Sequence, residues 1–438
     1  MNRLPFFVQT PWVGAVGNMS EEMYYALLRA RRENRKVLFL FPYDLFKPFV
    51  FSKFGLGINS ELKKIESVYR FGKYNNPFII FLNIILTLAC SILILIDVTI
   101  GKFVNFPRWF RVPQIGKELL WRRNKKEKYS YERVRKWNWG HELQTYLEIN
   151  LPKKSLLRAK EIRLKMGLPE DAWFVCLHNR EGGYYSQAKG YKEGQVKVIR
   201  NADIKNYIKA IKYITKNGGW VVRIGDQNMT KLPKMKNVID YPFTEYKSDL
   251  MDIYLLKECN FFIGPRSGIA ETAIMFQKPA VFVNWIAELN FLPWLSGSLV
   301  IYKHIFHNKL DRFLSLKDML HFTLYGDSYM DTSTNTYDLI ENSEEEIYCV
   351  VKEFLNNKNK GVRYTDGSKI WIKKCVENSI AVYNKFDDTR IPDTLKFRES
   401  PTLFGGGGTV GSKFYKDFYN TALQDKSRTL DPKEGVVL

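Results

Sequence analysis

Short apolar runs alternate with amphipathic stretches along the chain, and this alternation predicts a parallel α/β sheet. At the N-terminus, the apolar run 6–9 precedes a loop of small residues at 14–18. An amphipathic stretch follows, which Ser20 can cap and which ends near Asn34, and then comes the buried run 36–41. The order strand, glycine loop, helix and strand is typical of the beginning of a Rossmann-like unit.

The same alternation returns after residue 170 with clearer boundaries. Strands are predicted at 172–177, 220–224, 261–263 and 280–283, and helices at 203–216, 249–259, 268–276 and 343–355. Asp203 caps the first of these helices, and Ser343 with Glu346 forms a capping box for the last. This order predicts a doubly wound parallel sheet with its ligand at the carboxyl ends of the strands.

The longest apolar run, residues 78–96, has no charged residue in its 19 positions, which is enough to span a bilayer. The aromatic and basic stretch 102–111 that follows suits a lipid–water interface. A single span would place the strands at 6–41 across the membrane from the rest of the sheet, where they could not stand alone. We therefore expect a membrane-associated helix at about 77–97 that dips into one leaflet or lies along the surface. A fully buried core helix is the alternative.

A basic, helix-forming stretch at 151–166 separates two domains. We predict an N-terminal Rossmann-like domain over 1–150 and a C-terminal Rossmann-like domain over 151–385. The remaining tail, 386–438, is expected to pack partly back on the N-terminal domain and to end in disorder.

The composition is that of a globular protein, but the net charge is +21. This excess favours anionic partners, which include phosphates, nucleic acid and anionic lipid. The five cysteines are scattered, which supports neither a disulfide framework nor a zinc site, and the N-terminus lacks a signal-peptide core. These features favour the cytosol.

Candidate ligand groups follow the strand predicted at 172–177. His178, Arg180 and Glu181 come directly after it and precede two glycines. At the carboxyl end of a strand, backbone amides and a guanidinium can bind a phosphate. The alternative is that Arg180 and Glu181 pair with each other in a surface loop.

A second candidate group lies at the end of the strand 220–224. Arg223 stands in an otherwise apolar strand, where it needs a counter-charge or a ligand. Gly225 and Asp226 follow it. A structural partner such as Asp226 or Asp240 is the alternative to a ligand phosphate.

The third candidate group opens a helix after the strand 261–263. Arg266, Ser267 and Gly268 stand at its N-terminus, where free N–H groups and the helix dipole suit a diphosphate. Glu271, one turn later, can accept hydrogen bonds from sugar or ribose hydroxyls, or it is simply solvated. An ordinary capped helix is the alternative for the whole group.

The sequence contains no motif of the common nucleotide-hydrolysing, serine-hydrolase or metal-dependent enzymes. GxxxxGK[ST], GxSxG and HExxH patterns are absent, and so is any Asp-x-Asp pair. We therefore expect no metal, so that arginines and a helix dipole would neutralise a leaving diphosphate.

Three stretches carry a resemblance: VCLHNREGGYY, RNADIKNYIKAIKYITKNGGWVVRIGD and KSDLMDIYLLKECNFFIGPRSG. Together they resemble a family of glycosyltransferases from bacterial surface-polysaccharide gene clusters. They are more distantly similar to O-fucosyltransferase-like enzymes of the GT-B type, in which two Rossmann-like domains face a cleft. The resemblance covers roughly residues 170–290. It implies a nucleotide-sugar donor held mainly by the second domain, and it makes Arg180 of a His-x-Arg motif a ligand of the donor's diphosphate.

The sequence therefore predicts an α/β GT-B fold and a metal-independent glycosyltransferase without a cofactor. Its donor is a nucleotide-diphosphate sugar, with a GDP-sugar favoured, and its acceptor is a lipid-linked or cell-envelope glycan at the cytoplasmic face of the membrane. Arg180, Arg266, Ser267 and Gly268 would hold the diphosphate, with Arg223, Gly225 and Asp226 shaping the same crevice. The acceptor side would be lined by Gly14, Gly17 and Asn18.

A general base could be Glu181 or His178, with Asp44 as a weaker candidate. Two rival functions stay open: a nucleotide-sugar epimerase or hydrolase on the same fold, and a non-catalytic membrane scaffold of a polysaccharide assembly. A nucleic-acid binder is not expected, because the basic residues are spread along the chain without a recognised binding motif.

Overall fold

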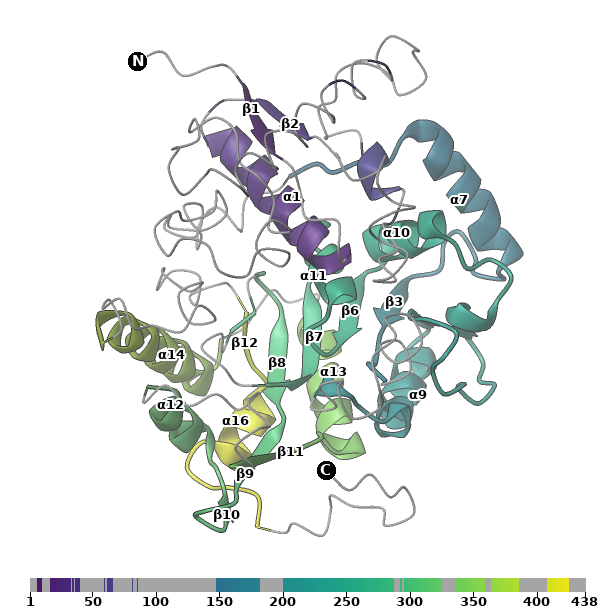
Figure 1. Cartoon of the computed structure of the whole chain (residues 1–438). Coiled ribbons are helices and arrows are strands. Elements are labelled where there is room, and N and C mark those ends of the chain that lie inside the picture. The colour runs from purple at the N-terminus through teal and green to yellow at the C-terminus, as the bar shows by residue number, and fades with distance from the viewer. Residues whose placement is uncertain are drawn as a thin grey trace, which may run out of the picture.

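The computed structural model describes residues 6–9, 16–32, 34, 36–39, 59, 61–65, 81, 85, 147–181, 200–286, 292–293, 295–324, 336–358, 364–385 and 408–424. Within these residues, a seven-stranded parallel sheet forms the centre of the molecule (Figure 1). Its strand order is β12-β8-β7-β6-β3-β4-β5. The strands are β3 (Phe174–Leu177), β4 (Trp220–Arg223), β5 (Val238–Asp240), β6 (Phe261–Gly264), β7 (Ala280–Trp285), β8 (Leu299–Tyr302) and β12 (Thr409–Val410).

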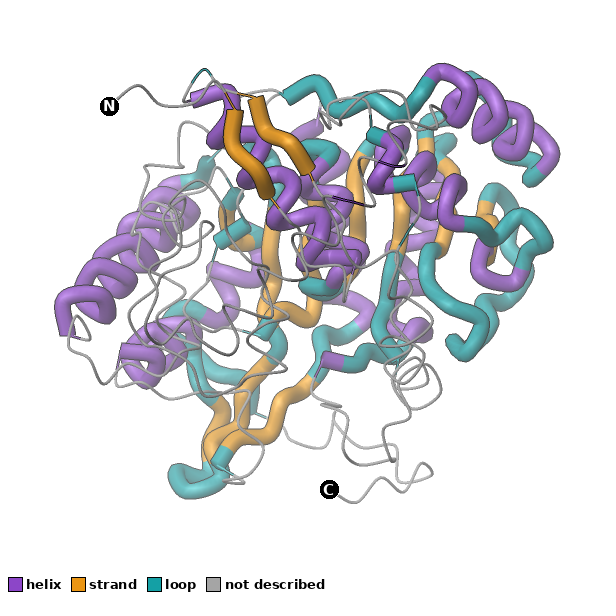
Figure 2. Tube along the Cα trace, turned by 45° about the horizontal axis from the view of Figure 1, so that its top comes forward, coloured by secondary structure: helices purple, strands orange, loops and turns teal. Residues whose placement is uncertain are grey.

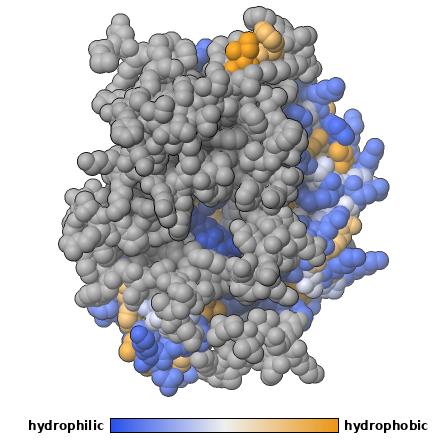
Figure 3. All heavy atoms as spheres, in the orientation of Figure 1, coloured by the Kyte–Doolittle hydropathy of each residue, from blue (hydrophilic) through white to orange (hydrophobic). Residues whose placement is uncertain are grey.

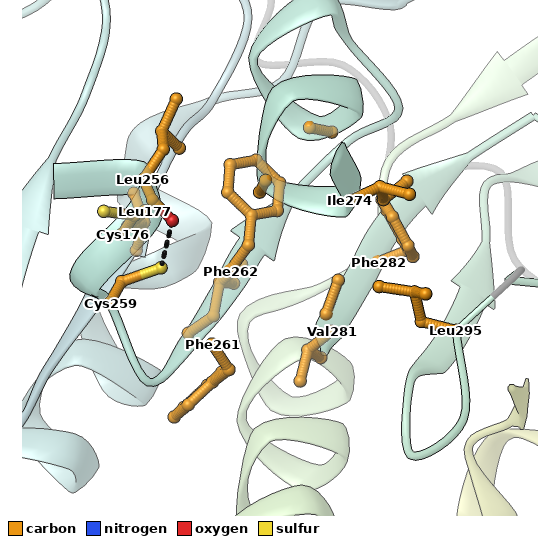
Figure 4. Packing of buried hydrophobic residues seen from close by; sticks show 14 of the residues in the cluster. Cys176, Leu177, Leu256, Cys259, Phe261, Phe262, Ile274, Val281, Phe282 and Leu295 are labelled. Atoms are coloured by element: carbon orange, nitrogen blue, oxygen red, sulfur yellow. Dashed lines mark hydrogen bonds between the residues drawn. The ribbon is translucent and has the colours of Figure 1, made fainter. Parts of the chain in front are cut away.

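The strands β3, β6, β7 and β8 are buried along their whole length. Such continuous apolar runs are typical of a parallel sheet that is covered on both faces. Phe261 and Phe262 of β6 show this, because successive side chains of a strand point to opposite faces. The centre of the Phe261 ring lies 4.5 Å from that of Phe354 in α13 (Glu344–Lys358). The centre of the Phe262 ring lies 6.4 Å from that of Phe282 in β7, and Figure 4 shows both side chains.

The chain leaves the middle of the sheet in two directions. From β3 it runs outward to β4 and β5, then returns past β3 to β6 and continues to β7 and β8. The loops after β3 and β6 therefore lead to opposite sides. We call the carboxyl ends of these two strands, residues 178–181 and 264–268, the switch point; in doubly wound folds it is where ligands bind.

The two directions of the chain also decide where the helices lie. Because crossovers between parallel strands are right-handed, the helices of the two halves cover opposite faces of the sheet. On one face, η4 (Ile204–Tyr207) and α9 (Ile208–Lys216) pack with α13. On the other, α10 (Asp249–Glu258) packs with α11 (Gly268–Met275) and with α7 (Lys153–Lys165). The predicted caps are confirmed: Asp203 accepts from the amide of Lys205, and Ser343 and Glu346 bond reciprocally.

The N-terminal strand, helix and strand are confirmed as β1 (Phe6–Gln9), α1 (Val16–Arg32) and β2 (Lys36–Phe39), and the two strands pair in parallel. This small sheet lies apart from the larger one (Figure 2). The prediction that Ser20 caps the helix is wrong. The helix begins at Val16, so Gly17 belongs to its first turn, and the Ser20 hydroxyl donates to the carbonyl of Val16 at 2.9 Å.

A small antiparallel sheet extends the chain beyond β8. It consists of β9 (His304–His307), β10 (Arg312–Phe313) and β11 (Tyr337–Ile340), in the order β10-β9-β11. The remaining helices are α12 (Leu316–Leu324), α14 (Asp366–Lys385) and α16 (Ser412–Phe418), with short 3₁₀ turns at η2 (Leu62–Lys64) and η5 (Tyr241–Phe243).

The described part of the tail, residues 408–424, lies elsewhere than predicted. Its strand β12 pairs with β8 of the larger sheet, and α16 packs against α13 and α14. The tail therefore completes the C-terminal sheet at one edge, whereas we expected it on the N-terminal domain. A two-residue edge strand and a helix of seven residues give too little pattern for the sequence to place them.

The hydrophobic run 78–96 falls almost wholly outside the described residues. Phe81 and Ile85, its two described positions, are 58% and 44% exposed. At these positions the alternative of a fully buried core helix is wrong. Among the described residues, no helix combines the length and apolar character that crossing a membrane would require.

Candidate functional site

The two loops of the switch point are in close backbone contact. The amide of His178 donates to the carbonyl of Ile263 at 2.9 Å. Gly264 has φ = +154°, and a Cβ at this position would lie 2.2 Å from the carbonyl oxygen of His178. Only glycine fits such a backbone next to such a neighbour. The end of β6 is thereby held against the end of β3.

His178 lies buried at this junction. Its Nδ1 is 2.9 Å from the carbonyl oxygen of Ile224, so Nδ1 carries the proton and donates it. Burial, together with a smaller effect of the nearby cations Arg223 and Arg180, lowers the pKa of His178 to about 4. The imidazole is therefore neutral at pH 7 and weakly basic, which counts against His178 as the general base.

This low pKa makes stability depend on pH between about 4 and 6.5. In this window the unfolded chain binds a proton at His178 that the folded chain excludes, so stability falls as the pH falls. We expect a loss of up to about 1.4 kcal/mol per pH unit from this group. Urea unfolding at several pH values, compared with His178→Asn, measures it. The variant should show a shallower dependence, and parallel curves for the two proteins would contradict the assignment.

Arg223 and Glu181 form a buried network at the ends of β3 and β4. The Arg223 side chain is fully buried and donates to Glu181 Oε1 at 3.0 Å, to Asn179 Oδ1 at 3.1 Å and to Asp240 Oδ1 at 3.4 Å. It also donates to the carbonyl of Thr230. These contacts favour the structural alternative for Arg223 over donor binding.

The second oxygen of Glu181 is equally engaged. Oε2 accepts from the amide of Thr230 at 2.7 Å and from its hydroxyl at 2.9 Å, while Oε1 also accepts from Asn179. A carboxylate with both oxygens bonded in this way holds the two loops together. Glu181 pairs with Arg223 across two strands, and the predicted role as a general base loses support.

Gly225 and Asp226 form the turn after β4. A Cβ at Gly225 would lie 2.0 Å from the sulfur of Met229, so the glycine makes room for that side chain. Asp226 accepts from the amide of Asn228 at 2.8 Å, which closes the turn. Both residues support the loop that carries Thr230.

The loop after β6 presents its polar groups at the N-terminus of α11. Ser267 caps the helix, since its hydroxyl accepts from the amide of Ala270 at 3.3 Å. Arg266 is about one third exposed, and its Nε donates to the buried carboxylate of Glu271 at 3.1 Å. Its guanidinium also lies 5.6 Å from the centre of the Trp285 ring. Glu271 and Trp285 thus orient Arg266 beside the helix end.

The N-terminus of α1 meets the N-terminus of α11 at this place. A Cβ on Gly17 would lie 2.2 Å from Gly268 Cα, so the two backbones touch. One turn further on, the hydroxyls of Ser20 and Thr272 are 2.9 Å apart, and Tyr24 accepts from Gln277 at 3.4 Å. The contacts occur in the same order along both helices. The helices are therefore parallel, and their positive dipole ends lie side by side.

The switch point thus brings together His178, Arg180, Arg266, Ser267 and Gly268, and α1 of the N-terminal segment adds Gly17. Arg180 follows β3 directly, and its carbonyl accepts from the amide of Ala202 at 2.9 Å. Gly14, Asp44 and the side chain of Asn18 lie outside the described residues. Gly17 was predicted in a loop on the acceptor side, whereas it contacts the helix of the predicted diphosphate site.

Sequence reasoning missed Lys303, which follows β8 at the same edge of the sheet. It is buried, and its Nζ donates to the carbonyl of Asn201 at 2.7 Å. Burial lowers its pKa to about 8. This hydrogen bond fixes the position of the chain just before η4 and α9. A lysine at the end of the apolar run 299–302 was the available signal.

Within the described residues, no group of three or more His, Cys, Asp or Glu side chains is placed to hold a metal ion. The arrangement can bind an anion through two helix N-termini and arginines.

No family model matches the chain, and no curated protein matches it. Among solved structures, it is similar to the glycosyl transferase family 9 protein from Veillonella parvula, with 12% identity and a TM-score of 0.42, over 80% of this chain and 97% of that one. It is also similar to ADP-heptose LPS heptosyltransferase II of E. coli, with 13% identity and a TM-score of 0.35, over 63% and 83%. A third is NodZ α-1,6-fucosyltransferase co-crystallised with GDP, with 12% identity and a TM-score of 0.31, over 64% and 96%.

Proposed function

We propose that this chain is a glycosyltransferase that takes a sugar from a nucleotide-diphosphate donor, with the diphosphate bound at the switch point. The observation that carries the proposal is the parallel pairing of α1 and α11, which sets two helix N-termini side by side at Gly17 and Gly268. The field of a helix dipole acts within about one turn of its end, so both dipoles act at the same place. Arg266 stands at that place, oriented by Glu271.

These groups suit the departure of a diphosphate. In the transfer, an acceptor hydroxyl oxygen bonds to the anomeric carbon while the bond from that carbon to the β-phosphate oxygen breaks. The charge that grows on the leaving diphosphate would be stabilised by the amides at both helix ends and by Arg180 and Arg266. A base on the acceptor side takes the hydroxyl proton. Because His178 and Glu181 are committed to the fold, Asp44 is the remaining candidate of those we predicted.

The donor, acceptor and location that we propose follow the sequence. A GDP-sugar is the favoured donor, and a lipid-linked or envelope glycan the acceptor. The cytoplasmic face of the membrane is where such a chain would meet that acceptor. The hydrophobic run 78–96 and the net charge of +21 support this placement.

Nucleotide binding tests the proposal. We expect one of GDP, UDP, ADP or dTDP to raise the melting temperature of the purified protein without divalent metal. Arg266→Ala and Arg180→Ala should each weaken that binding by about 10- to 100-fold, the equivalent of losing one charge-assisted hydrogen bond. Isothermal titration gives the affinities.

Arg312→Ala is the matched control. Arg312 is an exposed arginine of β10 that pairs with Asp318, so its loss should leave nucleotide affinity unchanged. If no nucleotide binds, the transferase proposal fails, and the rival function of a non-catalytic membrane scaffold is favoured. If a nucleotide sugar is bound and hydrolysed or epimerised without any acceptor, the rival enzyme on this fold is favoured.

A further inference from the structure

The helix α7 carries an exposed row of positively charged side chains, most of which make no ion pair with the residues that the structure describes. One side of it is buried, at Ala159 and Arg163, against the rest of the domain. Its exposed side chains comprise five cations and one carboxylate together with two leucines: Lys153, Lys154, Leu157, Arg158, Lys160, Glu161, Leu164 and Lys165. The helix lies at the upper right of Figure 1, on a side where Figure 3 shows mostly hydrophilic residues with a few hydrophobic ones among them.

The cations of α7 have fewer carboxylate partners than those of the exposed helix α14. Lys160 lies 3.4 Å from Glu170, but the other four cations of the row make no ion pair with any described residue. On α14, by contrast, Lys369 pairs with Asp366, and both Lys373 and Lys374 pair with Glu377. The positive potential above α7 is therefore available to an external anionic partner.

Leu157 and Leu164 identify the kind of partner. Each is 54% exposed, and seven residues are close to two helical turns, so both lie on the same side of α7. Exposed leucines among lysines are typical of a helix that lies in a lipid–water interface, with its cations at anionic headgroups. A nucleic-acid surface would use the cations but gains nothing from the leucines, and this row has no aromatic residue to stack on a base.

The chain itself connects α7 to the hydrophobic run. Ser155 of α7 donates to Glu61 Oε2 at 3.1 Å, which holds the segment 61–65 on the helix. That segment leads toward the run 78–96, in which Phe81 and Ile85 are exposed. The basic helix with exposed leucines thus contacts a segment that precedes the hydrophobic run in the sequence.

We propose that α7 is a docking helix that binds the surface of an anionic lipid bilayer through Lys153, Lys154, Arg158 and Lys165, with Leu157 and Leu164 entering the interface. The inference rests on the membrane location in the proposed function and names the surface responsible. Lipid binding by α7 requires neither turnover nor nucleotide binding. An experiment can therefore contradict the docking helix without contradicting the glycosyltransferase proposal, and the reverse.

Vesicle flotation with the full chain tests it. Wild type should bind vesicles of three parts phosphatidylcholine to one part phosphatidylserine more tightly than pure phosphatidylcholine vesicles, with the difference lost at high salt. The triple variant K153Q/K154Q/R158Q should weaken binding to the anionic vesicles on the order of 100-fold. L157S/L164S should weaken the binding that persists at high salt.

The control is K369Q/K373Q/K374Q on α14, which removes the same charge from an exposed helix and should bind as wild type does. If the two triple variants bind anionic vesicles equally well, the proposal is wrong. It is also wrong if wild type binds vesicles with and without phosphatidylserine equally well. If K153Q/K154Q/R158Q loses binding to an oligonucleotide but still binds vesicles, α7 is a nucleic-acid-binding helix instead. Nucleotide affinity should be unchanged in every variant.

Discussion

Replacing Arg223 with methionine is expected to lower the free energy of unfolding by about 3–5 kcal/mol. The guanidinium is fully buried and joins Glu181 to Asp240, whose side chains are only 20% and 19% exposed. Methionine fills part of the space, but two carboxylates and the Asn179 amide oxygen lose the hydrogen bonds that the guanidinium donates. Urea unfolding followed by tryptophan fluorescence measures the loss.

Two further variants make this result specific. Lys160→Met breaks an exposed ion pair with Glu170 and should cost no more than about 1 kcal/mol. Combining Arg223→Met with Glu181→Gln should recover part of the stability, because a neutral amide is cheaper to leave unpaired than a carboxylate. A stable Arg223→Met protein that has lost nucleotide binding would instead restore Arg223 to the donor site.

Local pattern was sufficient to predict the strands and helices of the sheet's centre. The run 261–263 lies between the predicted helix 249–259 and the Gly264–Ser267 turn, and the fold places β6 there. The Ser343–Glu346 box likewise marks the start of α13. In these segments burial, capping and turn residues all agree, and such consistency makes local prediction succeed.

Partners that are distant in sequence could not be predicted in the same way. Glu181 follows Arg180 in the chain, yet its partner is Arg223, and the two meet because β3 and β4 are neighbours in the sheet. Which strands become neighbours is decided by the packing of the whole sheet. The role of Glu181 therefore changed from a predicted base to a structural carboxylate.

The start of α1 was misplaced for a related reason. Gly17 has low helix propensity, and Ser20 is a common cap, so local preference favours a loop up to Ser20. Contact with α11 outweighs this preference: Gly17 permits the close approach to Gly268, and Ser20 bonds to Thr272 inside the interface. Tertiary packing can override local preference where two helices touch.

Gly17→Ala is expected to weaken nucleotide binding and to destabilise the fold together, because it drives α1 away from α11. The added Cβ would lie 2.2 Å from Gly268 Cα and 3.0 Å from its carbonyl carbon and oxygen. These are backbone atoms, so the helices must separate, which costs about 1–3 kcal/mol for an overpacked interface. Separation also moves one of the two helix N-termini from the diphosphate, and thermal shift with the bound nucleotide measures the result.

Gly218→Ala separates the two effects. Gly218 has φ = +80°, and no atom lies within 4 Å of an added Cβ. Alanine there should therefore lower the free energy of unfolding only by the cost of a left-handed backbone conformation, about 1–2 kcal/mol. It lies at the opposite end of β4 from the switch point, and nucleotide affinity should be unchanged. If Gly17→Ala and Gly218→Ala lose stability alike and both keep full nucleotide affinity, the paired helix ends do not bind the diphosphate. A selective loss of affinity in Gly17→Ala would place the diphosphate between them.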